Sequence, residues 1–324
     1  MLQVVRYSNE KKTLWNQFVI HSKNATFLFQ RDFMDYHQHR FEDYSLMVFD
    51  NQSLVGLLPA NRKDNIVYSH QGLTYGGLIL SETVGFKTVL KVMKGILECL
   101  ENDGVDHLII KPTPKIYHKQ PADEIDYLLF LLKAELVECH LTSTIKLDER
   151  LNIKSSNRKR NLKKAKTKGL IIDEVDDPKE FWNTILIPNL RERFGVKPVH
   201  SLQEIQLLKS RFPKQIRHFN AFYENKVVAG VTVFETDKVA HLQYISTNSK
   251  YRNLGGLDLI IDHLLNEVYR DKSFFDFGIS NENKGLQLNS GLMSWKESFG
   301  GRPICHQMYD IQPQNHKLLT SVWK

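Results

Sequence analysis

A glycine-containing segment is the clearest candidate for binding chemistry in this sequence. The residues TNSKYRNLGGLDLII (247–261) lie between a predicted strand and a predicted helix, with Arg252, Asn253, Gly255 and Gly256 where the helix begins. Backbone N–H groups are free at a helix N-terminus, and glycine lets an anion approach them without obstruction by a Cβ atom. The guanidinium of Arg252 would add charge-assisted hydrogen bonds. The segment predicts a phosphate or pyrophosphate site, and the alternative is an ordinary glycine turn that opens a packed helix.

Two residues on predicted strands are candidates for proton transfer. Asp276 stands in the sequence FFDFG, and Tyr244 lies on the strand before the glycine segment. A carboxylate between Phe275 and Phe277 is expected to be desolvated, which raises its pKa toward the range in which a general base works at neutral pH. The alternative is a structural aspartate whose hydrogen bonds are satisfied.

The run SSNRKRNLKKAKTK (155–168) contains many basic residues and no acidic one. It predicts a helix whose side chains, including Arg158, Arg160, Lys163 and Lys164, bind an external phosphorylated ligand, because a solvated helix usually includes Glu for i,i+4 pairing. Three ligands fit: the diphosphate part of an envelope precursor, the acceptor arm of an aminoacyl-tRNA, and anionic lipid headgroups at a membrane surface. A helix that is merely solvated is the alternative.

The net charge of +7 comes from this part of the chain. Residues 151–172 contain basic residues and no acidic ones, and outside them the charges nearly cancel, so the high pI alone does not indicate nucleic-acid binding. The three cysteines are far apart and form no CxxC pair, so we expect neither a disulfide framework nor a metal site. This cysteine usage also predicts a cytoplasmic location. The N-terminus predicts no signal peptide, and no apolar run reaches the ~18 residues of a membrane span.

The elements that would position these residues occur twice along the chain. Two predicted hairpins, FDNQSLVG (49–56) and YENKVVAG (223–230), share the same order of aromatic, acidic, polar, apolar and glycine positions. A strand, a helix and a strand follow each hairpin. We infer two copies of one α+β unit, with domains at residues 1–150 and 151–324. A chance match between two common hairpins is the alternative.

Hydrophobic periodicity sets the expected bounds of the main elements after each hairpin. In the first copy, residues 85–102 place six apolar side chains on one helical stripe. In the second copy we expect strands at 239–247 and 274–280 and a helix at 257–270. The glycine segment would therefore join the central strand of the second unit to its main helix.

These features resemble the GNAT acyltransferase superfamily. The residues Arg252-Asn253-Leu254-Gly255-Gly256-Leu257 are similar to the R-x-x-G-x-G/A motif of that superfamily, although Leu257 stands where the motif has Gly or Ala. The tandem units, the basic segment and GLMSWKESFGG (291–301) resemble the FemABX group of tandem-GNAT transferases and their bacterial relatives. The resemblance implies an α+β fold with two mixed, largely antiparallel sheets flanked by helices.

The resemblance also implies a reaction. A FemABX-like enzyme would move an acyl or aminoacyl group from a small phosphorylated donor to an amine acceptor, with acyl-coenzyme A as co-substrate and no permanent cofactor or metal. Lys296 would stabilise the oxyanion of the tetrahedral intermediate, because acyl transfer builds negative charge on the carbonyl oxygen. The alternative for Lys296 is a solvated helix lysine.

Two other functions stay open from the sequence. One is transfer from aminoacyl-tRNA to a peptidoglycan precursor, although residues 170–217 contain no long heptad arm of the kind that clasps tRNA in some FemABX proteins. The other is a non-catalytic nucleic-acid-binding protein that uses the basic run at 155–168.

Overall fold

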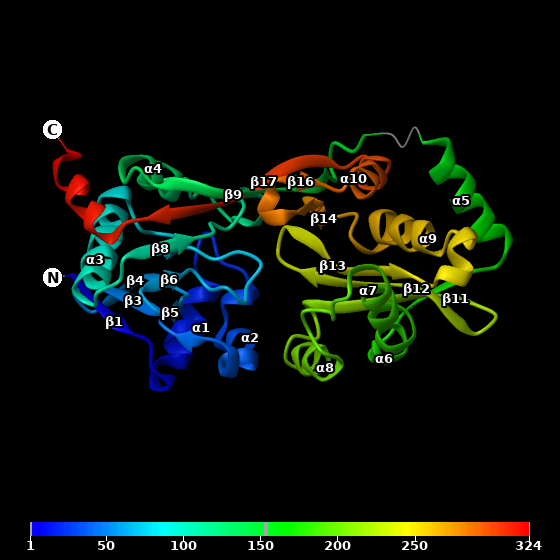
Figure 1. Cartoon of the computed structure of the whole chain (residues 1–324), viewed down its shortest axis with the longest axis horizontal. Coiled ribbons are helices and arrows are strands. Elements are labelled where there is room, and N and C mark those ends of the chain that lie inside the picture. The colour runs from blue at the N-terminus through cyan, green and yellow to red at the C-terminus, as the bar shows by residue number, and fades with distance from the viewer. Residues whose placement is uncertain (1, 152–154, 324) are drawn as a thin grey trace. The chain divides into compact units, whose positions relative to one another are not determined.

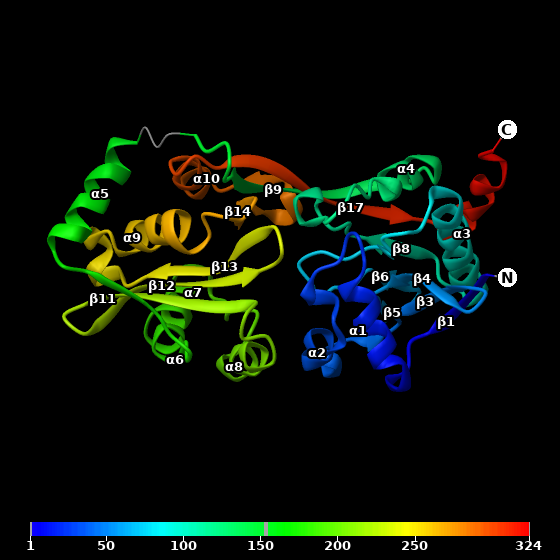
Figure 2. The same cartoon turned by 180° about the vertical axis from the view of Figure 1, so that it is seen from behind.

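The computed structural model describes residues 2–151 and 155–323 and divides the chain into two compact units (Figures 1 and 2). Unit 1 contains Met1–His140, Lys284–Leu286 and Cys305–Lys324, and unit 2 contains Leu141–Asn283 and Gln287–Ile304. The expected range 151–324 for the second domain differs from unit 2 at both ends. The reason is that strand β9 (Glu135–Lys146) carries the chain into unit 2, and strand β17 (Arg302–Ile311) carries it back to unit 1.

Unit 1 is built on two small groups of strands with α3 packed against one of them. One sheet has the order β1-β3-β4-β7, and in the other group the end of β17 pairs with β8, followed by β6, β5 and β2. Neighbours are antiparallel except for the parallel pair β6–β8. The strands and helices of unit 1 are β1 (Leu2–Arg6), α1 (Lys12–Ile20), α2 (Arg31–Met34), β2 (Glu42–Asp43), β3 (Leu46–Asp50), β4 (Ser53–Leu58), β5 (Asn61–Lys63), β6 (Ile66–Tyr68), β7 (Ile79–Leu80), α3 (Phe86–Asn102), β8 (His107–Ile110) and α4 (Glu124–Leu131).

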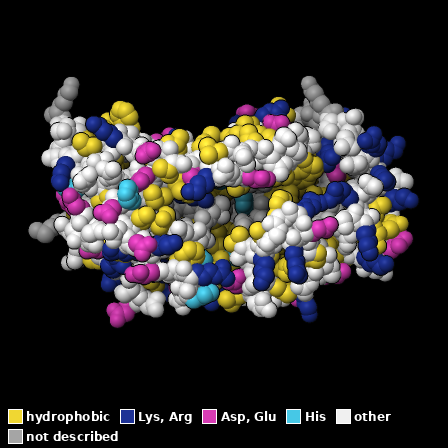
Figure 3. Space-filling view, viewed as in Figure 1, with side chains coloured by type: hydrophobic (Ala, Val, Ile, Leu, Met, Phe, Trp, Pro, Cys, Tyr) yellow, Lys and Arg dark blue, Asp and Glu magenta, His cyan; other side chains and the backbone are white. Residues whose placement is uncertain are grey.

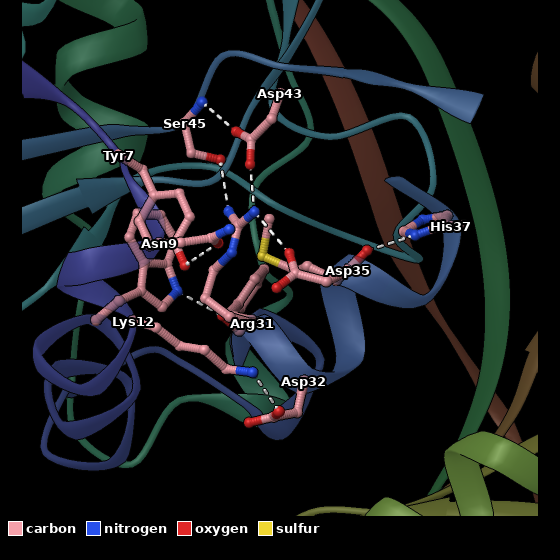
Figure 4. Close-up of polar contacts among 12 residues, drawn as sticks. Tyr7, Asn9, Lys12, Arg31, Asp32, Asp35, His37, Asp43 and Ser45 are labelled. Atoms are coloured by element: carbon pink, nitrogen blue, oxygen red, sulfur yellow. Dashed lines mark hydrogen bonds and ion pairs between the residues drawn. The ribbon is translucent and has the colours of Figure 1, made fainter. Parts of the chain in front are cut away.

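A buried arginine ties the first helices of unit 1 to the strands (Figure 4). The Arg31 side chain is 5% exposed and forms ion pairs with the carboxylates of Asp35, at 2.7 Å, and of Asp43. Its guanidinium also donates to the hydroxyl of Ser45 at 3.2 Å and lies 3.8 Å from the centre of the Tyr7 ring. Because two carboxylates neutralise this cation, the cluster is explained as a structural link between elements.

Unit 2 has one mixed sheet with helices on both faces. The strand order is β10-β11-β12-β13-β14-β9, in which only β13–β14 is parallel, as the expected largely antiparallel sheet requires. Helix α9 covers one face together with α5, and α6 and α8 lie on the other (Figure 1). The elements of unit 2 are α5 (Ser156–Thr167), β10 (Ile171–Glu174), α6 (Lys179–Phe181), α7 (Ile187–Phe194), α8 (Leu202–Arg211), β11 (Ile216–Tyr223), β12 (Lys226–Glu235), β13 (Val239–Thr247), α9 (Gly256–His263), β14 (Phe274–Ile279), β15 (Asn281–Glu282), β16 (Gln287–Leu288) and α10 (Ser290–Glu297).

Strands β13 and β14 part soon after they begin. Their parallel pairing covers Val239↔Phe274, Ala240↔Phe275 and His241↔Asp276, whereas β13 continues to Thr247. The register of β14 against β9 also shifts between Asp276 and Ile279, where Gly278 has φ +73°. Polar groups near Asp276 therefore lie where the sheet opens, and this point organises the candidate site.

Candidate active site in unit 2

The glycine segment forms the expected turn into a helix. Arg252 and Asn253 are exposed on the 3-10 turn Ser249–Leu254, and Gly255 follows with φ +80° directly before α9. This left-handed conformation favours glycine. Gly256 begins α9 and is buried. A Cβ atom at this position would lie only 3.2 Å from the Val228 side chain.

Helix α5 occupies the space in front of the α9 N-terminus. A Cβ atom at Gly255 would lie 2.5 Å from the carbonyl oxygen of Asn161, which belongs to α5. Asp258, the third residue of α9, is 7% exposed, and its carboxylate forms an ion pair with Arg158 at 2.6 Å. The carboxylate of Asp258 thus supplies the negative charge that a helix N-terminus favours. The prediction that Gly255 and Gly256 cradle donor phosphates is not supported by this arrangement, because α5 and an internal anion lie there instead.

The basic helix α5 has two different sides. Arg158 pairs with Asp258 of α9, and Lys166 pairs with Asp262 of α9 at 3.2 Å, so these two cations have internal acidic partners, and the arrangement does not support the predicted role of Arg158 in binding an external ligand. The sequence of α5 alone could not indicate these acidic partners, because they come from a helix about a hundred residues later. Arg160 is exposed and, among the residues that the structure describes, donates only to Asn157 of its own helix. Lys and Arg side chains gather over α5 in Figure 3.

Two lysines on the outer side of α5 are free for a ligand. Lys163 and Lys164 are both exposed, and neither forms an ion pair within residues 2–151 and 155–323. Helix α5 also packs against the turn that carries Arg252. The predicted binding residues Arg160, Lys163, Lys164 and Arg252 therefore belong to adjoining exposed elements, whereas Arg158 is only 13% exposed and pairs with Asp258 of α9.

Lys296 is a buried residue of α10. It is 1% exposed, and its ammonium donates to the carbonyl oxygens of Gly278 and Ile279, each at 2.7 Å. Burial lowers the pKa of Lys296 to about 8, with the charge of Asp276 acting in the opposite direction. A solvated helix lysine is therefore excluded. Helix α10 is positioned by Trp295, whose ring meets that of Phe277 at 5.8 Å between centroids.

Asp276 is fully buried on β14 and its carboxylate is held from three directions. One oxygen accepts hydrogen bonds from the hydroxyl of Thr144 at 3.1 Å and from the backbone N–H of Gly278 at 3.2 Å. The other oxygen lies 2.8 Å from Nδ1 of His241 on β13. A carboxylate with this many partners orients its neighbours, so the geometry favours a positioning role over the predicted role of direct general base.

His241 is the functional candidate that the sequence analysis missed. Its Nδ1 faces the Asp276 carboxylate, which favours the tautomer with the proton on Nδ1 and leaves the lone pair on Nε2. The side chain is 12% exposed, and Nε2 has no hydrogen-bond partner within the part of the chain that the structure describes. The strand register that pairs His241 with Asp276 was the missing signal.

Tyr244 lies in a second buried pair on the same strand. Its hydroxyl is 2.6 Å from Nδ1 of His200 and accepts the backbone N–H of His200 at 3.1 Å. The Tyr244 ring also meets the edge of Trp182 with centroids 4.9 Å apart. Its hydrogen bonds to His200 give Tyr244 a structural role, joining β13 to the segment before α8.

The structural comparisons decide the fold. FemX matches with a TM-score of 0.69 and 10% identity over 98% of this chain and 99% of that chain. The chain has a FemABX-like tandem GNAT fold. L-PGS from Bacillus licheniformis, with a TM-score of 0.59 and 13% identity over 97% and 94%, is also similar. A tandem GNAT protein from the clavulanic acid biosynthesis pathway matches at 0.51 and 11% identity over 97% and 99%.

Sequence comparison adds nothing to this FemABX-like assignment. The sequence matches no protein-family model and no curated protein. Within residues 2–151 and 155–323, no group of three or more His, Cys, Asp or Glu side chains is arranged to hold a metal ion. The same residues contain no helix with the length and apolar character needed to cross a membrane.

Proposed function

We propose that this FemABX-like protein transfers an acyl or aminoacyl group from a phosphorylated ester or thioester donor to an amine. The observation that carries the proposal is the cluster of Lys296, Asp276 and His241 where β13 and β14 part. It combines a buried cation, a held carboxylate and an imidazole with one free nitrogen. Acyl transfer to an amine needs a base for the amine proton and a positive charge for the oxyanion.

The chemistry assigns one step to each residue. Nε2 of His241 accepts a proton from the amine as the amine nitrogen bonds to the donor carbonyl carbon, and Asp276 holds the ring. Lys296 uses two N–H groups on backbone carbonyls, so its third N–H is left to stabilise the developing oxyanion. When the intermediate collapses, the C–O or C–S bond breaks and the imidazolium returns its proton to the leaving oxygen or sulfur.

The donor is proposed to bind on the exposed basic surface and not at the α9 N-terminus. Arg160, Lys163, Lys164 and Arg252 are exposed on adjoining elements, and phosphate groups suit such cations. Both acyl-coenzyme A and aminoacyl-tRNA carry phosphates that fit this description. A peptidoglycan precursor with a free amine is the acceptor class that the FemABX resemblance implies.

The catalytic proposal is tested by product formation. The purified chain is incubated with acyl-coenzyme A or aminoacyl-tRNA and amine acceptors, and amide products are detected by mass spectrometry. We expect Lys296→Met to lower kcat by about a hundredfold or more, as loss of an oxyanion donor does. His241→Ala should lower it by a similar factor and recover partly with added imidazole, while His263→Ala, on the nearby α9, should act as wild type. Full activity in both Lys296→Met and His241→Ala contradicts the assignment.

Donor binding separates the enzyme from a nucleic-acid-binding protein, which the basic outer side of α5 also favours. Charge reversal of Lys163 and Lys164 to Glu should weaken binding of the true donor by about tenfold or more, and Lys87→Glu in unit 1 should not. An enzyme also makes product, so its loss of binding is matched by a rise in KM. A protein that binds tRNA with steep salt dependence but forms no amide with any donor would instead be the binding module.

A further inference from the structure

An exposed apolar segment with basic residues covers the last turn of α7 and the residues after it. We call residues 191–199, with the sequence RERFGVKPV, the 191–199 segment. Three of its apolar side chains are exposed to solvent: Phe194 is 59% exposed, Val196 50% and Val199 68%. Apolar residues this exposed and this close together indicate an interaction surface more than ordinary surface variation.

The charges of the 191–199 segment accompany these apolar side chains. Arg191, Arg193 and Lys197 are exposed, and none of them forms an ion pair within residues 2–151 and 155–323. Glu192 is the one acidic residue of the segment. The segment thus combines a positive charge excess with apolar side chains that have no cover.

Both ends of the 191–199 segment are held by the body of unit 2. Before it, the side-chain amide of Asn189 donates to the hydroxyl of Ser246 at 2.7 Å and to the carbonyl of Thr247 at 2.9 Å. After it, the buried His200 is hydrogen-bonded to the Tyr244 hydroxyl, and the Ser201 side chain caps the N-terminus of α8. Helix α7 itself ends at Phe194, and Gly195, which follows it, has φ +66°. Presenting a segment with anchored ends loses less conformational entropy on binding than ordering a free loop.

We propose that the 191–199 segment docks this protein on the surface of an anionic phospholipid bilayer. Phe194, Val196 and Val199 would enter the boundary between headgroups and acyl chains, while the flanking cations meet lipid phosphates. Nucleic acid would use the cations and gain nothing from exposed valines, so the combination favours lipid. The inference stands on exposure and charge alone and does not depend on the proposed acyl transfer.

A second exposed apolar patch provides a matched control. Tyr127 and Phe130 of α4 are 48% and 75% exposed, and their rings stack with centroids 6.3 Å apart. The acidic residues Asp123 and Asp126 lie beside them in sequence and share one cation, Lys115, at 2.6 and 3.5 Å, so this patch has the apolar exposure without an excess of positive charge. Phe130→Ser should therefore leave bilayer binding unchanged.

Vesicle flotation of the full chain tests the proposal. Wild type should bind vesicles of phosphatidylcholine with phosphatidylglycerol and bind pure phosphatidylcholine weakly. The double variants Phe194→Ser with Val199→Ser, and Arg193→Glu with Lys197→Glu, should each lose about tenfold or more in affinity. If both bind as wild type, or if charge reversal at Lys163 and Lys164 of α5 alone abolishes binding, the proposal is overturned. If the wild-type chain binds no vesicle at low salt, the proposal is also overturned, and a protein becomes the partner to test for the 191–199 segment.

Depth of insertion is a second measurement that does not rely on loss of binding. Phe194→Trp keeps an aromatic side chain, and vesicles with brominated acyl chains should quench its added fluorescence relative to wild type. Phe130→Trp should show no added quenching. Vesicle binding without extra quenching of the Phe194→Trp protein would mean that the apolar residues stay in water, which overturns the proposal.

Discussion

The buried ammonium of Lys296 predicts an unusual dependence of stability on pH. Its pKa in the folded chain is about 8, against an ordinary value of 10.5. Between these values the unfolded chain holds the proton and the folded chain releases it, so the free energy of unfolding rises with pH across the window. Below about pH 8 both states are protonated, and the folded state bears the full cost of the buried charge.

The magnitude follows from the same two values. The difference between 10.5 and about 8 corresponds to about 3 kcal/mol, at about 1.4 kcal/mol for each pH unit. About 2 kcal/mol of this should be gained between about pH 7 and about pH 9.5. No discount for solvent screening is needed, because Lys296 is 1% exposed.

Lys296→Met removes the titrating group and is the perturbation of choice. Urea unfolding of wild type and variant is measured at a series of pH values, and the difference between them cancels groups that titrate elsewhere. Loss of the hydrogen bonds to Gly278 and Ile279 adds an offset that does not vary with pH. Wild type should therefore gain about 2 kcal/mol relative to the variant as pH rises, whereas exposed Lys250→Met should track wild type. If the difference in free energy of unfolding between wild type and Lys296→Met stays constant with pH, then the pKa of Lys296 is not lowered by burial, and the proposed catalytic cluster is refuted with it.

Three further changes test the packing around the α9 N-terminus in unit 2 and around the buried arginine of unit 1. Gly255→Ala should lower the free energy of unfolding by about 2 kcal/mol more than Gly169→Ala, because both have positive φ but only Gly255 lies against the α5 backbone. Arg158→Met should cost about 3 kcal/mol by leaving the Asp258 carboxylate buried without its cation, and adding Asp258→Asn should recover part of the loss in a double-mutant cycle. In unit 1, Arg31→Met should cost about 3 to 5 kcal/mol in urea unfolding, because two carboxylates lose their buried partner.

Local pattern was sufficient for the main elements of the fold. The helix expected at 85–102 is α3 at Phe86–Asn102, and the strand expected at 274–280 is β14 at Phe274–Ile279. Helix α9 ends at His263, and its continuation at Leu264–Val268 has the wider turn of a π-helix, so the expected range of 257–270 was too long for a regular helix. Hydrophobic periodicity reports which face is buried, and it does not report how the last turns of a helix are wound.

Long-range contacts account for what the sequence did not reveal about the site. The conformation of Gly255 could be anticipated from its place before a helix, but the approach of α5 could not, because Asn161 and Gly255 are far apart in the chain. The same holds for Asp276 and His241, which meet through the parallel register of β13 and β14. Residue types on one strand suggest a base, and only the neighbouring strand shows which group holds it and which is free.

Two of the buried cations of this protein, Arg31 and Lys296, differ in a way that bears on function. Arg31 touches two carboxylates, so its burial is compensated and the fold alone explains it. Lys296 directs its hydrogen bonds to neutral carbonyl oxygens, and burial lowers its pKa to about 8. No carboxylate of the described residues forms an ion pair with Lys296, so a methionine of similar length would relieve the desolvation of the ammonium, although it would remove the hydrogen bonds to the carbonyls of Gly278 and Ile279. Retaining a lysine there is explained best if a negative charge forms beside it during a reaction, which is what the proposed oxyanion supplies.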